Sequence, residues 1–159
     1  MNRQPLLSNR SPLVEAANHL LPGLWKAHAL ARPELDAGHL LEAARTSTGL
    51  DDFGDPWFLR PMGKLLAALR DEAELNAVGR FGAYGQLLKT LRERLWTEHW
   101  FRSHPEIGDR ALSRPVVIVG PMRSGTTRLH RLLAVDERFA HLRLFETICP
   151  APAPTFAGP

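Results

Sequence analysis

The sequence has little cysteine, little lysine and no long apolar run. Cys149 is the single cysteine among 159 residues, so no disulfide can form within the chain, which excludes a disulfide-stapled scaffold and predicts a reducing, cytoplasmic location. Proline, glycine or charge interrupts every apolar stretch before the roughly 20 residues that a bilayer-spanning helix requires, so we expect no transmembrane span. Residues 1–10 lack the apolar core of a secretory signal.

What the sequence does contain is typical of a globular chain. Apolar residues make up 44% and charged residues 23%, and the formal net charge is +3. The 17 arginines and 3 lysines are interspersed with 17 acidic residues along the whole sequence. Because a nucleic-acid-binding face needs its basic residues gathered together, this scatter argues against a nucleic-acid partner. Histidine, cysteine and acidic residues show no metal-ligand spacing, so we predict no metal.

The part of the chain up to residue 112 has the apolar spacing of helices. A first helix is expected to begin after Ser11 and to end at Pro22, because serine is a good N-cap and proline interrupts helices. A second short helix is expected to begin near Pro33 and to end at Gly49. We therefore expect two short helices in the first third of the sequence.

Two longer amphipathic helices should follow. Asp55 and Pro56 predict a cap and first turn, after which leucine and methionine recur at offsets of three and four up to Leu69. A longer helix is expected after Gly79, ending at His104. Three tryptophans lie in or beside these helices and are expected to have structural roles: Trp57, Trp96 and Trp100.

From Pro115 onward the pattern changes to that of a parallel sheet. Val116–Val119 are four consecutive β-branched residues between a proline and a glycine, which is typical of a buried parallel strand. Leucines of residues 129–133 mark one face of a following helix, and the alternation over Leu142–Phe145 predicts a second strand. The sequence therefore predicts an α/β fold that starts with one βαβ unit, preceded by an all-helical region.

The loop Gly120–Thr127 joins the predicted strand to the predicted helix, which is where phosphate-binding loops lie. Gly125 lets the backbone turn sharply and approach an anion closely. Thr126 stands where the triphosphatase pattern G-x-x-x-x-G-K-[ST] has its lysine. Arg123 is then the cation of the loop, and a monophosphate-like anion fits this arrangement better than a magnesium-bound triphosphate.

The segment Pro121–Thr127 resembles the P-x-[RK]-S-G-T-T loop of sulfotransferases, which use 3′-phosphoadenosine 5′-phosphosulfate (PAPS). The resemblance continues through Leu129–Ala134 and Phe145–Thr147, as in bacterial members and, more distantly, the tyrosylprotein sulfotransferases. Asp51–Pro56 and His104–Ile107 are similar to the helical N-terminal part of the bacterial group.

This resemblance implies the nucleotide-binding, P-loop-type parallel three-layer fold of sulfotransferases, here truncated. Residues 1–112 would be a helical N-terminal region, and residues 113–159 the start of the sulfotransferase domain. The family's residues for the 3′-phosphate and the adenine come later than the second strand. We therefore expect the chain to be the N-terminal portion of a longer sulfotransferase, or the product of a truncated reading frame, and to be inactive by itself.

The resemblance also assigns roles to residues. The 5′-phosphate of the cofactor would be held by Arg123 and by the four residues that follow it, Ser124, Gly125, Thr126 and Thr127. Arg123 would also stabilise the charge that grows on the leaving oxygen. The sulfuryl group would pass to a hydroxyl or amine of a small-molecule, lipid or peptide acceptor.

Glu146 is the candidate catalytic base that takes the proton of the acceptor. If Leu142–Phe145 form a strand, Glu146 emerges at its carboxyl end, where ligands of open α/β sheets bind. Tyrosylprotein sulfotransferases are similar in placing a glutamate after the second strand. The alternative for Glu146 is a structural salt bridge or a solvent-facing position at the end of the strand.

Two other classes of function stay open. One is a different P-loop enzyme, such as a small-molecule kinase, which predicts magnesium-dependent ATP or GTP binding and is disfavoured by Thr126. The other is a non-catalytic helical interaction module made by residues 12–112, which predicts a stable helical fragment without anion affinity.

Overall fold

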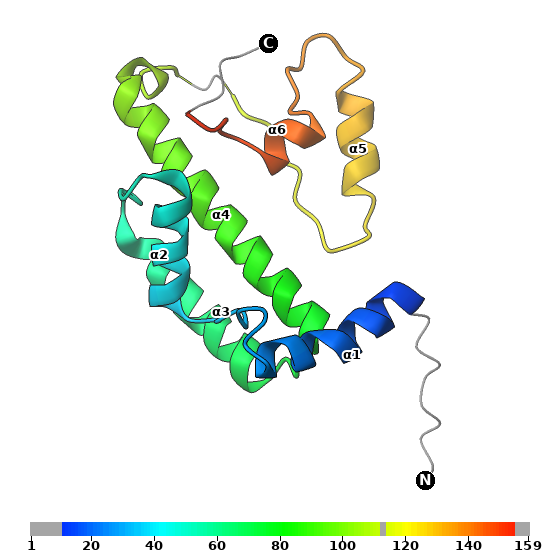
Figure 1. The fold of residues 1–159 in the computed structure, drawn as a ribbon. Helices are drawn as coiled ribbons and strands as arrows, with labels where there is room; N and C mark the ends of the chain where they lie inside the picture. Colours follow the sequence, from blue (N-terminus) through cyan, green and yellow to red (C-terminus); the bar gives the residue numbers. More distant parts are fainter. Residues whose placement is uncertain (1–10, 112–113, 155–159) are drawn as a thin grey trace. The chain divides into compact units, whose positions relative to one another are not determined.

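The computed structural model describes residues 11–111 and 114–154 (Figure 1). Its elements in chain order are α1 (Pro12–Lys26), α2 (Ala37–Thr48), the 3₁₀ turn η1 (Pro56–Phe58), α3 (Leu59–Asp71), α4 (Ala77–Ser103), the 3₁₀ turn η2 (Pro105–Ile107), α5 (Thr126–Leu133) and α6 (Leu144–Ile148). The chain divides into two compact units, Met1–Leu95 and Trp96–Pro159. The predicted boundary between residues 112 and 113 lies outside the described residues. Of the helices described, none is long and apolar enough to cross a membrane.

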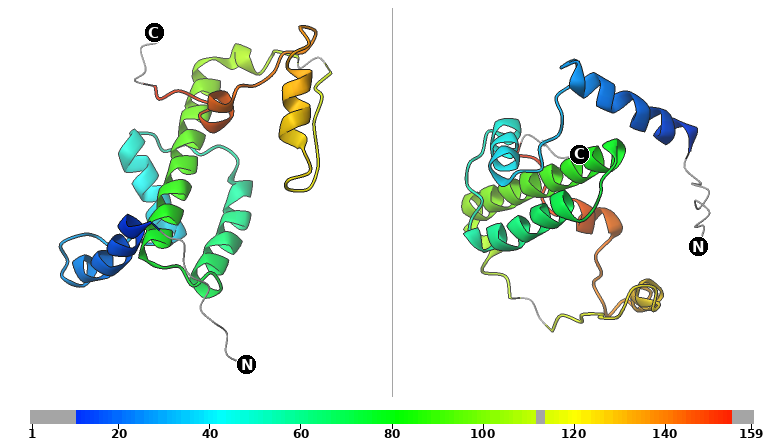
Figure 2. Two further views of the ribbon diagram at one scale, coloured as in Figure 1. Left: turned by 90° about the vertical axis from the view of Figure 1, so that its right-hand side faces the viewer. Right: turned by 90° about the horizontal axis from the view of Figure 1, so that it is seen from below.

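The core of the first unit lies between α2, α3 and the first part of α4, which run beside one another (Figure 2). Leu40 of α2 and Leu95 of α4 are fully buried, and removing such a side chain from water stabilises a fold by about 1.5–3 kcal/mol. The buried members of this core are Leu35, Leu40, Ala44, Phe53, Met62, Leu66, Leu91 and Leu95. The amphipathic pattern over Leu59–Leu69 is confirmed as α3, since Met62 and Leu66 face the core.

Capping residues set the ends of the first two helices. The side chain of Ser11 accepts a hydrogen bond from the backbone N–H of Val14 (3.4 Å), which confirms the predicted start of α1. The predicted end at Pro22 is wrong, because α1 continues to Lys26. A proline removes one N–H donor from a helix, and at an exposed position water can bind the carbonyl that loses its partner.

The second helix begins later than predicted and ends where predicted. Asp36 is its N-cap, because its Oδ2 accepts the backbone N–H of His39 (3.1 Å), so the expected start near Pro33 is early. Pro33 is buried, and its carbonyl oxygen accepts the Arg80 Nε–H (2.8 Å). Gly49 adopts the left-handed conformation (φ 69°) that closes α2, as the sequence predicts.

The segment Asp51–Pro56 is attached to α4 by one arginine. Arg94 Nε donates to the carbonyl oxygen of Phe53 (2.6 Å), and its Nη2 donates to the carbonyl oxygen of Asp55 (2.9 Å). The guanidinium lies 4.4 Å from the centroid of the Phe58 ring. Asp55 also caps η1, because its Oδ1 accepts the Trp57 N–H (2.9 Å). This segment therefore has a structural role in the first unit.

The predicted α/β fold is not observed, since the structure contains helices and no strand in residues 11–111 and 114–154. Val116–Val119 have no regular structure, and Val119 is 88% exposed. Over the predicted second strand, Leu142–Phe145, helix α6 already begins at Leu144. A strand is defined by the ladder it makes with a neighbour, and no neighbour is present here. The expectation of a three-layer fold with a parallel sheet is therefore wrong for these residues.

Apolar side chains of the second unit are left facing an open cavity of about 870 Å³. Its walls come from the residues before the loop, from α5 and from the residues around the start of α6, and they include Val116, Val117, Ile118, Ala134, Val135, Leu142 and Leu144. In a sheet protein, residues with this pattern are buried on both faces. Here most of them remain exposed.

Candidate anion-binding site

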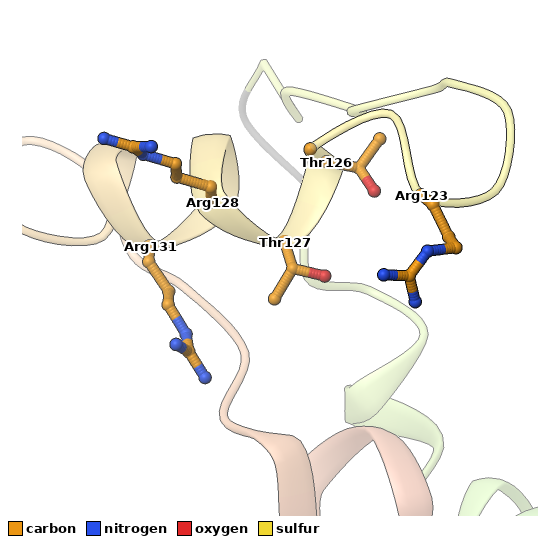
Figure 3. A pocket seen from close by; sticks show the side chains of 6 residues that line it. Arg123, Thr126, Thr127, Arg128 and Arg131 are labelled. Carbon is orange, nitrogen blue, oxygen red and sulfur yellow. The ribbon is translucent and has the colours of Figure 1, made fainter.

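A cationic cavity lies at the N-terminal end of α5. It has a volume of about 580 Å³ and is lined by Arg123, Gly125, Thr126, Thr127, Arg128 and Arg131 (Figure 3). The lining thus provides three guanidinium groups and two hydroxyls, and it includes no acidic side chain. Guanidinium groups bind phosphate and sulfate oxygens through charge-assisted hydrogen bonds. The composition of the lining therefore favours an anionic ligand.

The loop before α5 is a tight turn that depends on two glycines. Gly125 has φ 92° and Arg123 has φ 61°, both in the left-handed region. A Cβ added to Gly120 would lie 2.7 Å from Ser124 Oγ and 2.9 Å from Thr126 Cγ2. Only glycine fits at residue 120 without moving these side chains, and glycine is favoured at residue 125 by its φ. The turn is closed by the Ser124 N–H, which donates to the carbonyl oxygen of Pro121 (3.3 Å).

The first turn of α5 has backbone donors without helical acceptors. The first α-helical bond runs from the Leu129 N–H to the Gly125 carbonyl oxygen (3.0 Å). The N–H groups of Thr126, Thr127 and Arg128 precede it and have no acceptor within the helix. Gly125 is the N-cap, and no side chain caps this end. The positive end of the helix dipole is consequently available to a ligand in the cavity.

Most of the residues that the sequence predicts for phosphate binding line this cavity. Arg123, Gly125, Thr126 and Thr127 do so, and the hydroxyls of both threonines lie on the side of the Arg123 guanidinium (Figure 3). Ser124 is not part of the lining. Its hydroxyl lies against Gly120 instead.

Two lining residues, Arg128 and Arg131, were not predicted from the sequence. Their positions in the sequence could have predicted them, because residues one to four positions beyond a phosphate-binding loop occupy the first turns of the following helix. Arg131 is four residues after Thr127, so the two share a face of α5, and Figure 3 shows both side chains on that face. The cavity is therefore more cationic than the loop motif alone indicates.

Glu146 lies in α6 and outside the cavity lining. Its Oε2 accepts the backbone N–H of Arg143 (2.5 Å), and its own N–H donates to the Arg143 carbonyl oxygen (3.1 Å). This reciprocal pair stabilises the start of α6. The structure thus gives Glu146 a local partner but does not bring it together with Arg123, Thr126 and Thr127.

Other titratable groups of the second unit form local pairs. The rings of His130 and His141 meet edge to face with centroids 6.2 Å apart. Arg138 donates side-chain and backbone hydrogen bonds to the carboxylate of Asp136, just after α5, and these bonds hold the pKa of Asp136 below its usual value. No group of three or more histidine, cysteine or acidic residues suited to a metal ion occurs in the part of the chain that is described.

Comparison with known proteins relates this chain to one solved enzyme. No family model matches the sequence, and no curated protein matches it. Among solved structures, the chain is similar to sulfotransferase STF1 from Mycobacterium tuberculosis H37Rv, with a TM-score of 0.69 and 32% sequence identity. The match covers 76% of this chain and 34% of that chain. This chain is therefore sulfotransferase-like over most of its length, and it spans about a third of the enzyme that it resembles.

Proposed function

We propose that the chain carries the donor-binding loop of a sulfotransferase that uses PAPS. The observation that carries the proposal is the cavity at the start of α5, with its three arginines and two threonine hydroxyls. The likeness to the sulfotransferase STF1 supports the same proposal. The reaction class is transfer of a sulfuryl group to a hydroxyl or amine of an acceptor.

The residues of the cavity suit a donor with a phosphate group. The uncapped N–H groups at the start of α5 and the hydroxyls of Thr126 and Thr127 would hold the phosphate oxygens. Arg128 and Arg131 add two positive charges to the same cavity, which suits a ligand with more than one anionic group. Thr126, in place of a lysine, disfavours a triphosphate.

Each reacting group has a role in this proposal. The donor, when bound, supplies an activated sulfuryl group. Arg123 would stabilise the negative charge on the phosphate oxygen as its bond to sulfur breaks, because a guanidinium binds the more highly charged oxygen more strongly. Glu146 would accept the proton of the acceptor as the new bond to sulfur forms, once an acceptor brings its hydroxyl to the carboxylate.

The test is thermal stabilisation by adenosine 3′,5′-bisphosphate, the product that the donor leaves behind. A ligand that binds only the folded protein stabilises it by about 2.7 kcal/mol at 100 times its dissociation constant. For a chain of this size that raises the melting temperature by about 5–10 °C. Arg123→Ala should abolish the shift at the same ligand concentration. The control is Arg110→Ala, since Arg110 is exposed and does not line the cavity.

A second variant separates the shape of the loop from its charge. Gly120→Ala adds a Cβ that would press on Ser124 and Thr126, so we expect weaker binding although every arginine is kept. Stabilisation by ATP with magnesium alone would instead indicate a kinase-like enzyme. Equal shifts in the wild type and Arg123→Ala, or no shift with either ligand in a folded protein, would contradict the proposal.

A further inference from the structure

A third pocket of the Trp96–Pro159 unit lies between the last turns of α4 and the chain that follows α6. Its volume is about 300 Å³, and its lining residues are Thr97, Trp100, Phe101, Ile107, Pro150, Ala151 and Pro152. Six of these seven side chains are apolar or aromatic. Small-ligand sites have this character, and a pocket of this volume is at the small end of their range. The lining therefore favours a compact apolar group.

The walls of this pocket are held in place by hydrogen bonding and stacking. Trp100 Nε1 donates to the carbonyl oxygen of Pro152 (2.8 Å), and Ala151 is 7% exposed. The Trp100 ring also stacks on His104, with centroids 5.5 Å apart and an interplanar angle of 26°. Because the indole N–H is already bonded, Trp100 offers an entering ligand mainly its apolar surface.

The wall of the pocket is continuous with the helix that carries Glu146. Pro150 follows Glu146 by four residues, and consecutive Cα atoms are 3.8 Å apart, so their Cα atoms lie at most about 15 Å apart. A molecule with an apolar ring in the pocket therefore needs a linker of no more than about this length to bring a hydroxyl to the Glu146 carboxylate. Glu146 is exposed, so its carboxylate is accessible from solvent.

We propose that this pocket holds the apolar end of the acceptor. The substrate class is then an alcohol or amine with one compact apolar ring, joined to the reacting group by a short chain. The ring contacts Trp100, Phe101 and Ile107, and the hydroxyl or amine extends toward Glu146. This inference rests on the proposed sulfuryl transfer, but binding of the ring needs no donor.

The experiment measures binding of 2-phenylethanol to the full chain by ligand-observed NMR, with glycerol as the polar comparison. Phe101→Ala removes one wall and should weaken binding about 3- to 10-fold, as expected for the loss of one aromatic contact. Ile107→Phe should weaken it by narrowing the pocket. Phe81→Ala is the matched control, because both phenylalanines lie on α4 and are about half exposed (52% for Phe81, 47% for Phe101), yet Phe81 is not part of the pocket.

A second readout tests the acceptor role itself. The ¹³C resonance of the Glu146 carboxyl should shift when 2-phenylethanol binds to the wild type and should shift less at the same concentration in Phe101→Ala. Equal affinity of Phe101→Ala and Phe81→Ala for 2-phenylethanol would overturn the assignment of this pocket as the binding site. Equal affinity of the wild type for glycerol and 2-phenylethanol would overturn it as well. Ring binding without a change at Glu146 would overturn the acceptor role. Stabilisation by adenosine bisphosphate is measured separately, so failure of the proposed function is distinguishable from failure of this pocket.

Discussion

Replacement of the half-buried Arg94 by alanine should destabilise the first unit. The substitution removes two hydrogen bonds from a charged donor to the backbone of Phe53 and Asp55, at 2.6 and 2.9 Å. It also removes the contact with the Phe58 ring at 4.4 Å. With about 1–1.5 kcal/mol for each partly exposed bond and about 0.5–1 kcal/mol for the ring contact, the expected loss is about 3 kcal/mol.

Thermal unfolding followed by circular dichroism measures this loss. For a chain of about 150 residues, a change of about 3 kcal/mol lowers the melting temperature by about 6–12 °C. Arg94→Lys keeps the charge but replaces the two separate nitrogens that reach the two carbonyl oxygens with one ammonium, so we expect about half the loss. Arg60→Ala is the control, because Arg60 is an exposed residue of α3 and such changes stay within about 0.5 kcal/mol. Equal melting temperatures for Arg94→Ala and Arg60→Ala would refute this account of the Asp51–Pro56 segment.

Three further predictions concern packing, helix propensity and ionisation. Leu40→Ala should cost about 2–5 kcal/mol in urea unfolding because Leu40 is fully buried, whereas Leu13→Ala, at a position 78% exposed, should change stability by less than about 0.5 kcal/mol. Gly63→Ala should raise stability by about 0.5–1 kcal/mol, since Gly63 lies inside α3 and its new Cβ would meet nothing within 4 Å; a loss of stability would contradict the packing described here. The carboxyl pKa of Asp136, followed by ¹³C NMR, should lie below the usual range of an aspartate, because the Arg138 side chain donates to the carboxylate, and should rise in Arg138→Gln. Because the pKa of Asp136 is lowered in the folded protein, its contribution to stability is present at neutral pH and is lost as the pH falls through that pKa. A pKa that Arg138→Gln leaves unchanged would be inconsistent with the pairing of Asp136 and Arg138.

Local signals predicted the helical part of the fold well. The N-cap at Ser11, the left-handed glycine at Gly49 and the apolar face of α3 each depend on residues within a few positions of one another, and each is confirmed. The continuation of α1 through Pro22 was missed, because the cost of a proline depends on whether water can reach the carbonyl that it leaves unbonded.

The predicted sheet failed for a different reason. The four β-branched residues Val116–Val119 favour an extended backbone over a helix. Residues 115–120 indeed form no helix. A ladder also needs a neighbouring strand, and the alternation over Leu142–Phe145 did not supply one, because α6 begins at Leu144. No pattern within a short window can provide the missing neighbour.

For the candidate site, the spacing of the loop residues was informative. The structure places Arg123, Thr126 and Thr127 on one cavity, because glycine, cation and hydroxyls lie within eight residues of chain, and their role in phosphate binding stays a prediction. The role of Glu146 was inferred on the assumption of a strand that the structure lacks, so it now depends on the proposed experiments rather than on the fold.

The exposure of Val116–Val119 has a practical consequence. An extended, uncharged run of valine and isoleucine with no paired neighbour is a template on which strands of other molecules can add, and the same residues resemble the segments that nucleate aggregates. Protein concentration thus becomes an experimental variable in every binding measurement on this chain. Binding is therefore best measured in dilute samples, with a variant that carries a charged residue within Val116–Val119 as the reference for self-association. This comparison keeps self-association from being mistaken for ligand-induced stabilisation.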